Sequence, residues 1–451
     1  MKGEKKSSTM LMTEGVIWKQ LLLFSFPLLI GNLFQQLYNT VDSIVVGNFI
    51  GSQALAAVGS SNSLINLIIG MFMGIATGAG VIISQYYGAG NEKKLSWAVH
   101  TCIALSFIGG IFLSILGVIL SPYILKWMDT PKDVIDNSVI YLRIFFSGSL
   151  FNLLYNMSAG ILRAVGDSKR PLYYLCISSA VNIVLDLVFV LRFSMGIAGV
   201  GYATVIAQAV SAALAFSALM RTKDSYRVEL KKIAVDRRMM KRILAIGIPS
   251  GIQHSIISLS NVIVQANINV YGSAAMAGYG AYSKIDGFVM LPLQSFCIAA
   301  TTFTGQNIGA ESKGRVKQGI IQGIIISAVY TLALSPFLFW KARDLLQIFS
   351  SDPEVLRYGK ITMSLLIPFY GVLSVHQILM GTFRGAGKTM VTMLIGVGNM
   401  CILRMIYING IVPFFPSFEA VMLCYPITWT TTALMDVLYC WKGKWMPLGK
   451  E

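Results

Sequence analysis

The sequence predicts an all-α integral membrane protein of about twelve transmembrane helices in two six-helix bundles. Three observations predict this class: an apolar composition, apolar runs of membrane-spanning length, and a repeat between the two halves. Of the 451 residues, 55% are hydrophobic and 12% are charged, about half the charged share of a soluble globular protein. So few charges cannot cover a soluble surface of this size, and the remaining solvent must be lipid.

Charge and cysteine content exclude other classes. The net charge of +16 could indicate nucleic-acid binding, but the basic residues form short clusters between apolar runs, so no nucleic-acid partner is expected. The six cysteines lie singly and form no C-x-x-C pair, which predicts free thiols and neither disulfides nor a zinc site. The first apolar run contains Pro27 and continues past Gly31 without a cleavage site, so we expect no cleaved signal peptide.

The apolar runs have the length of membrane helices, each needing roughly 20 residues. They are 17–47, 54–85, 97–125, 138–161, 171–193, 199–220, 243–270, 274–305, 318–340, 360–382, 390–413 and 419–441. With the N-terminus in the cytoplasm, most Lys and Arg residues fall on the cytoplasmic side. This asymmetry predicts a multi-pass protein of the cell (inner) membrane with both termini in the cytoplasm.

The two halves repeat each other at one offset. GSQALAAVG at 51–59 matches GSAAMAGYG at 272–280, and GILRAVGDS at 160–168 matches GTFRGAGKT at 381–389, both 221 residues apart. The polar stretch 221–242 divides the runs six and six. We therefore predict an N-terminal lobe over 1–220, a cytoplasmic linker over 221–242 and a C-terminal lobe over 243–451. Six helices per half make the repeat parallel, so a substrate cleft is expected between the lobes.

GTFRGAGKT is not a phosphate-binding loop. Five residues instead of four separate Gly381 from Gly387, the first glycine is replaced by Thr382, and no strand precedes it. We expect no ATPase, no cofactor and no enzyme activity. Transport energy would then come from an ion gradient.

Acidic residues inside the apolar runs are the candidate functional groups, because a charge at the bilayer centre costs about 2.5–3.5 kcal/mol on insertion scales. Four such residues are Asp42, Asp186, Asp286 and Asp436. Asp42 shares one helix face with Asn32, Gln35 and Asn39, and Asp186 shares a face with Asn182. These oxygens could take up a proton or bind Na⁺. They could also form a polar packing network between helices.

At these residues the chain resembles the multidrug and toxic compound extrusion (MATE) family, over nearly its whole length. The resemblance implies a transporter that exports cationic or amphipathic organic compounds in exchange for H⁺ or Na⁺, and that works as a monomer. The pattern is most similar to the DinF-like branch, which implies a cation site in the N-terminal lobe. Its matching residues here are Tyr38, Asp42, Tyr141, Asn182, Asp186 and Thr204, with Asn156 the nearest match to an expected asparagine. For Na⁺, the implied ligands are Asp42, Asp186, Asn182 and Thr204.

Other residues of the pattern have different implied roles. Pro27 implies a hinge in the first helix, because a proline removes a backbone hydrogen bond. The glutamate that the NorM-like branch carries in its seventh helix is absent, and Val264 stands at the position that repeats Asp42.

The second half offers further candidates. Asp286 could form a separate site in the C-terminal lobe or a neutral pair with Lys284. His376, Gln377 and Gln35 could line the cleft, although an interior hydrogen-bonded histidine is the commoner case. Arg404 and Asp436 are expected to pair.

The sequence favours a secondary active multidrug antiporter that works by alternating access. Two alternatives stay open. A lipid-linked oligosaccharide flippase of the same superfamily would share the lobes, but usually has more helices and a more basic cleft. A membrane-embedded enzyme would need clustered ligands or nucleophiles, whereas His100, His254 and His376 are scattered.

Overall fold

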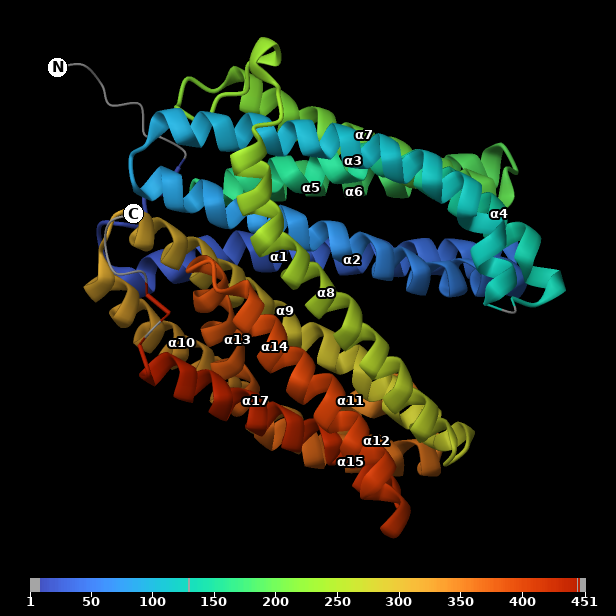
Figure 1. Ribbon diagram of the computed structural model, residues 1–451. Coiled ribbons are helices and arrows are strands. Elements are labelled where there is room, and N and C mark those ends of the chain that lie inside the picture. The colour runs from blue at the N-terminus through green and yellow to red at the C-terminus, as the bar shows by residue number, and fades with distance from the viewer. Residues whose placement is uncertain (1–8, 129, 444, 447–451) are drawn as a thin grey trace. The chain divides into compact units, whose positions relative to one another are not determined.

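The structure is a computed structural model that describes residues 9–446 except 129 and 444 (Figure 1). Seventeen α-helices form the described chain, and no strand occurs within these residues. They are α1 (Ile17–Val45), α2 (Ser52–Gly88), α3 (Glu92–Trp127), α4 (Lys132–Ser147), α5 (Ser149–Ala164), α6 (Lys169–Leu187), α7 (Gly196–Arg221), α8 (Arg237–Asn269), α9 (Ser273–Gly309), α10 (Lys313–Trp340), α11 (Ala342–Gln347), α12 (Pro353–Leu366), α13 (Tyr370–Gly385), α14 (Thr389–Val397), α15 (Arg404–Gly410), α16 (Phe418–Met422) and α17 (Cys424–Trp441).

The prediction of about twelve membrane helices is confirmed. Eleven helical runs of the described chain are long and apolar enough to cross a membrane. The twelfth is the pair α4–α5, which bends by 49° between Ser147 and Ser149. Several spans combine consecutive elements: α12 and α13 form one span, and α14 and α15 are joined by a π-helical turn at Gly398–Leu403.

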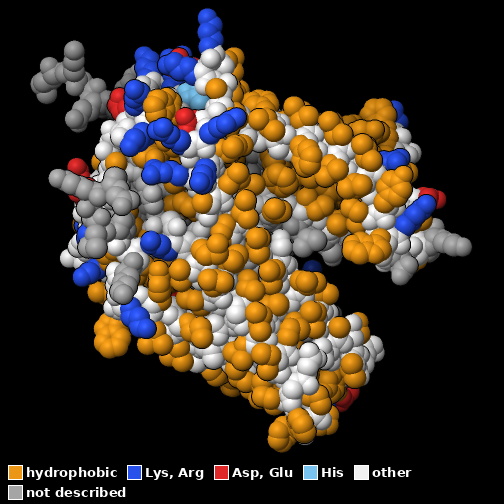
Figure 2. Space-filling model, viewed as in Figure 1, with side chains coloured by type: hydrophobic (Ala, Val, Ile, Leu, Met, Phe, Trp, Pro, Cys, Tyr) orange, Lys and Arg blue, Asp and Glu red, His pale blue; other side chains and the backbone are white. Residues whose placement is uncertain are grey.

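The flanks of the helices present apolar side chains, as a lipid-facing surface requires. On α3, Ile108, Ile111, Phe112 and Ile115 are all at least half exposed. Figure 2 shows hydrophobic side chains along the helices and basic side chains gathered at the end of α3 and α7 that carries the linker. The distribution agrees with a belt of lipid around the helices and water at their ends.

The chain divides into two compact units. The first comprises the residues up to Leu11 and Pro27–Gly247, and the second comprises Met12–Phe26 and the chain from Ile248 onward. The start of α1 therefore belongs to the second unit, and the start of α8 belongs to the first unit. Pro27 and Pro249 stand at or beside the two crossing points.

Particular contacts explain why these segments cross. Gly78 on α2 has no side chain, so the backbone of α8 at Ile243 and Gly247 packs directly against it. In the second unit, the backbone of Met12 is bound by Gln306 and Asn307, and Arg315 donates to the carbonyls of Met12 and Gly15. The sequence-based lobe boundaries do not include either exchange, because apolar runs carry no information about which helices they contact.

The linker is shorter than the predicted 221–242, since α7 ends at Arg221 and α8 begins at Arg237. The linker packs against the first unit. Tyr226 and Val228 are buried in that core, and the backbone N–H of Glu229 donates to Nε2 of His100 at 3.0 Å. His100 therefore has a structural partner in the linker.

Candidate cation-binding site

The site is built on α1 and α6 of the first unit. Gly31 on α1 packs beside Leu172 and Leu175 on α6. Both helices rise about 1.5 Å per residue, and Asp42 lies eleven residues after Gly31 as Asp186 lies eleven after Leu175. Because each aspartate lies eleven residues beyond the contact between α1 and α6, the two aspartates lie at the same height along the two helices.

A π-helical turn follows each aspartate. α1 continues into Val46–Ile50 and α6 continues into Val188–Arg192, and these two turns contact each other. A π-helical turn widens the helix and often marks a functional site. Neither π-helical turn was predicted from the sequence. A π-helical turn differs from an α-helical turn by one extra residue, and this residue leaves no recognisable pattern where all the neighbouring residues are apolar.

Asp42 and Asp186 face each other. Their carboxyl groups lie within hydrogen-bonding reach, and Asp186 is fully buried. Among the described residues, no donor reaches Oδ1 of Asp42 or either oxygen of Asp186. Two facing carboxylates without a donor repel each other, so this arrangement needs a shared proton or a bound cation.

Asn182 adds an amide one turn before Asp186. Its side chain is 2% exposed, and within the described structure neither its oxygen nor its nitrogen has a hydrogen-bond partner. A buried amide that makes no hydrogen bond costs about 1–3 kcal/mol. This cost is offset if its oxygen binds a cation or its N–H binds a carboxylate.

Tyrosine and threonine complete the surroundings. Tyr141 on α4 is buried and lies near enough to Asp42, Asp186 and Tyr38 to interact electrostatically with all three. Tyr38 lies one turn before Asp42, as predicted. The hydroxyl of Ser178 on α6 donates to the carbonyl of Ala207 on α7 at 2.7 Å.

That bond fixes the register of α6 against α7. One turn further along α6 is Asn182, and one turn back along α7 is Thr204. Thr204 is buried, and its Oγ1 donates to the carbonyl of Val200, which leaves its lone pairs available. The structure therefore brings Tyr38, Asp42, Tyr141, Asn182, Asp186 and Thr204 to one region of the first unit.

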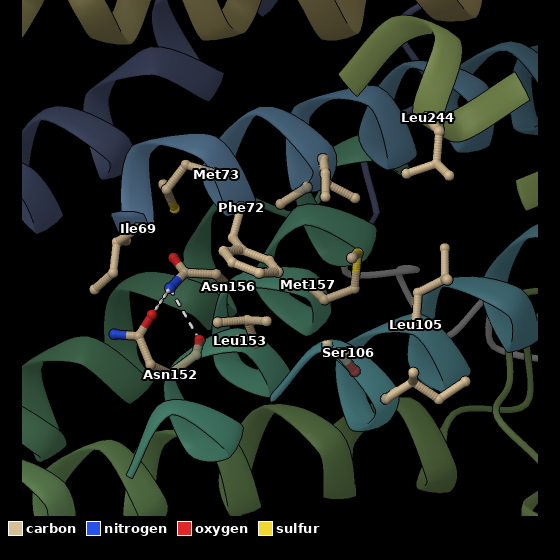
Figure 3. A pocket seen from close by; sticks show the side chains of 14 residues that line it. Ile69, Phe72, Met73, Leu105, Ser106, Asn152, Leu153, Asn156, Met157 and Leu244 are labelled. Carbon is tan, nitrogen blue, oxygen red and sulfur yellow. Dashed lines mark hydrogen bonds between the residues drawn. The ribbon is translucent and has the colours of Figure 1, made fainter. Parts of the chain in front are cut away.

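Asn156 has different neighbours. Its Nδ2 donates to Oδ1 of Asn152 at 3.0 Å and to the carbonyl of Asn152 at 2.9 Å. Both amides line a largely apolar cavity of about 150 Å³ with Phe72, Met73 and Leu244 (Figure 3). No contact of Asn156 with Asp42 or Asp186 is found among the described residues. Gln35 is exposed on α1 within its unit.

Asp286 is not paired with Lys284. Tyr370 and Tyr282 both donate to its Oδ1, at 2.7 and 3.1 Å, whereas Lys284 is exposed and forms no ion pair in the described chain. The two residues are two apart on one helix, so they point to different faces. Sequence reasoning missed the tyrosines because Tyr370 comes from another helix.

Asp436 is paired with His376 and not with Arg404, contrary to the sequence-based expectation. Oδ2 of Asp436 lies 2.6 Å from Nδ1 of His376, and both side chains are buried. Arg404 instead donates to Asn261 and Thr428, and its guanidinium stacks on Tyr425. His376 is thus an interior histidine with a hydrogen-bond partner, while its neighbour Gln377 is half-buried.

The chemistry of the Asp42–Asp186 site suits a hard cation or a proton. Carboxylate, amide and hydroxyl oxygens are ligands for hard cations such as Na⁺. Among the described residues, no three His, Cys, Asp or Glu side chains gather as a transition-metal site would require.

Known proteins resemble this chain in both sequence and fold. A family model described as MatE matches residues 27–188 and 249–408, and the two matches begin at Pro27 and Pro249. The probable multidrug resistance protein YoeA of Bacillus subtilis (strain 168) is 32% identical over 381 residues, or 83% of this chain and 82% of its own.

Two further similarities agree with this match. The probable multidrug resistance protein YpnP of the same organism is 29% identical over 396 residues, or 87% of this chain and 88% of its own. A solved structure, described as the outward-facing conformation of a multidrug resistance MATE family transporter of the MOP superfamily, has a TM-score of 0.91 at 22% identity. It covers 99% of this chain and 100% of its own.

Proposed function

The chain belongs to the MATE family of multidrug efflux transporters, and from this premise we propose that it is a secondary active antiporter that exports organic compounds in exchange for H⁺ or Na⁺. One observation carries the proposal. Asp42 and Asp186 face each other in an apolar helix bundle with buried oxygens that no described residue satisfies. Such a site is poised to bind and release a cation.

The exchange follows from competition between two states of the first unit. Without a cation, the two carboxylates repel each other and favour separation of α1 from α6. A proton or Na⁺ between them removes the repulsion and favours close packing of the two helices. Substrate release is then coupled to cation uptake when the substrate binds better to the separated state.

Pro27 is the proposed hinge for this motion. It lies inside α1, where its ring removes the hydrogen bond to the carbonyl four residues earlier. It also lies where α1 passes from the second unit to the first. A bend at this point would move Tyr38 and Asp42 while leaving residues 17–26 fixed to their own unit.

The relatives named as multidrug resistance proteins support an organic substrate for this chain. Cationic or amphipathic compounds fit the proposal best, because an acidic site in the bilayer can attract them as well as the coupling ion. In the cell the chain would lie in the inner membrane with both termini in the cytoplasm, since most of its Lys and Arg residues fall on that side.

The test is transport of a fluorescent cationic dye by the purified full-length protein in lipid vesicles. Either a pH gradient alone or a Na⁺ gradient alone is imposed, and dye movement is followed. We expect one of the two gradients to drive dye uphill in wild-type protein and neither to do so in Asp42→Asn or Asp186→Asn. If both variants keep wild-type rates, the proposed cation site is wrong.

A further inference from the structure

The first unit carries a basic patch that the proposed function does not use, at the end of α3 that adjoins the linker (Figure 2). The patch consists of Lys93 and Lys94 in the first turn of α3 and Arg238, Lys241 and Arg242 in the first two turns of α8. All five side chains are exposed. Lys241 and Arg242 follow Arg238 by three and four residues, so these three cations share one face of α8.

Two aromatic rings connect the cations of the basic patch. The hydroxyl of Tyr86, near the end of α2, accepts a hydrogen bond from Arg242, and Nζ of Lys94 lies 6.0 Å from the centre of the same ring. On α3, Nζ of Lys93 lies 5.2 Å from the ring centre of Trp97, one turn further along the helix. An aromatic ring attracts a cation without neutralising its charge. The patch is therefore one continuous positive surface built by α2, α3 and α8.

No carboxylate of the described residues pairs with the basic patch. Glu229 in the linker is paired with Lys232, and Oδ1 of Asp236 is used by a backbone N–H at the start of α8. Glu92, in the first turn of α3, is exposed and forms no ion pair within the described chain. Cations near the start of a helix are unfavourable because the helix dipole is positive there, and like charges on one helix face repel each other. A bound anion would remove both costs.

The repeat indicates what kind of group the basic patch can bind. At the offset of 221 residues, Lys94 corresponds to Arg315 at the start of α10. In the second unit, Arg315 donates to the carbonyl oxygens of Met12 and Gly15, in the segment before α1. Among the described residues, no oxygen accepts a hydrogen bond from Nζ of Lys94. The second unit therefore supplies oxygen acceptors to the cation at this position, whereas in the first unit an oxygen-bearing ligand from outside the chain can take their place.

Phospholipid headgroups supply anionic oxygens at the depth of the basic patch. α3 is a membrane span, and Trp97 lies eleven residues, or about 16 Å, before Ile108 on its exposed apolar flank. Trp97 is 46% exposed, and an exposed tryptophan at the end of a span is typical of the headgroup level. Lysine and arginine at this level attract anionic lipids. Lipid phosphates are held at the membrane surface, so their local concentration exceeds that of soluble anions.

We propose that the basic patch binds the headgroup of an anionic phospholipid, with the lipid phosphate between Lys94 and Arg242 and the ring of Trp97 beside the start of an acyl chain. A lipid with a net negative charge binds in preference to a zwitterionic lipid with the same chains, because five cations and no paired carboxylate face it. The bound lipid joins the start of α8 to the ends of α2 and α3. The charge of the surrounding lipid thereby acts on the packing of the first unit.

The test measures lipid binding beside Trp97 in purified full-length protein. The protein is placed in mixed micelles of a non-ionic detergent and phosphatidylglycerol with brominated acyl chains, which quench the fluorescence of a tryptophan that they contact. The chain has seven tryptophans, so the difference between each protein and the same protein carrying Trp97→Phe gives the signal of Trp97. Phosphatidylcholine with the same brominated chains provides the comparison with a zwitterionic headgroup.

We expect half-maximal quenching of Trp97 at a mole fraction of phosphatidylglycerol at least about ten times lower than that of phosphatidylcholine. One basic residue at the membrane surface strengthens binding to anionic lipid about fivefold. The double variant Lys93→Gln with Lys94→Gln should therefore weaken the binding of phosphatidylglycerol about 25-fold and leave that of phosphatidylcholine unchanged. The matched control, Lys313→Gln with Lys317→Gln, removes two exposed lysines from the start of α10, the corresponding helix of the second unit. It should keep the wild-type quenching of Trp97.

Equal quenching by the two lipids in the wild type would overturn the proposal, and this result does not depend on the folding of any variant. An equal loss in the two double variants would also overturn it, because binding would then follow the total charge of the protein and not the basic patch.

A soluble competitor distinguishes a lipid from a free anion. Glycerol phosphate carries the charged group of the lipid without its chains, and we expect millimolar concentrations to leave the quenching of Trp97 by phosphatidylglycerol unchanged. If glycerol phosphate displaces the lipid, the basic patch is a site for soluble anions and the lipid assignment is wrong. None of these measurements uses dye transport, so failure of this proposal and failure of the proposed function are distinguishable.

Discussion

Replacing Asp186 with asparagine is expected to stop coupled transport and to stabilise the protein at the same time. In the wild type, Asp186 is fully buried and faces Asp42 without a donor from any described residue. An asparagine at this position has nearly the same shape, but its amide N–H can donate to the carboxylate of Asp42. A repulsive contact thereby becomes a hydrogen bond to a charged acceptor.

The size of the effect follows from this exchange. A hydrogen bond to a charged group contributes about 1.5–3 kcal/mol, so the free energy of unfolding should rise by about that amount at alkaline pH. The gain should shrink as pH falls, because the wild-type pair then takes up a proton and loses its repulsion. A stabilised site that no longer functions is the usual trade between stability and activity.

The assay combines thermal unfolding in detergent at several pH values with dye transport in vesicles. Asp352→Asn is the matched control, because Asp352 caps α12 through backbone N–H groups at an exposed position and asparagine caps helices equally well. The control should keep both Tm and transport. Wild-type coupling in Asp186→Asn, or a lower Tm at alkaline pH, would refute the reasoning.

Three further predictions follow from the packing. Gly78→Ala should lower the free energy of unfolding by about 1–3 kcal/mol, because its Cβ would lie 2.5 Å from the carbonyl oxygen of Ile243. The control Gly59→Ala has open space around the new methyl group and should be neutral or stabilising by up to about 1 kcal/mol. Equal Tm values for the two variants would contradict this prediction. Asp286→Ala should lower the free energy of unfolding by about 1–3 kcal/mol, because the hydroxyls of Tyr282 and Tyr370 lie 3.2 Å apart and only one of them can use the other as a replacement acceptor. Asp286→Asn should cost less, and thermal unfolding that ranks the two variants in the opposite order would show that the tyrosines are not held by Asp286. Pro27→Ala should slow dye transport but preserve dye binding, with a gain in stability of at most about 3 kcal/mol; an unchanged transport rate would remove Pro27 from the hinge role.

The helices could be predicted because lipid imposes a simple pattern. Each span needs a run of apolar residues, and the runs and their repeat gave the number of helices and the two halves. The exchange of residues 17–26 and 237–247 between the units could not be predicted this way. It depends on close contacts such as Gly78 against the backbone of α8, whereas Gly59 and Gly280 stand in similar apolar runs with open space around them. A glycine in such a run therefore does not reveal which helix packs against it.

The candidate site was predictable where a residue has its partner on its own helix. Tyr38 and Asp42, and Asn182 and Asp186, follow from helical spacing, whereas the meeting of α1 with α6 rested on a family resemblance. Partners from distant helices were missed or misassigned: Tyr370 for Asp286, and His376 in place of Arg404 for Asp436. Spacing within a helix cannot indicate which of several polar residues on other helices lies opposite a given acid.

The most direct test of the central claim is reversed coupling. Wild-type protein in lipid vesicles is given a gradient of dye and no ion gradient, and the internal pH or Na⁺ concentration is followed with a trapped indicator. We expect dye that moves down its gradient to drive one of these cations in the opposite direction, and we expect Asp186→Asn to abolish this movement. Dye flux without any counter-movement of H⁺ or Na⁺ in the wild type would contradict exchange at Asp42 and Asp186.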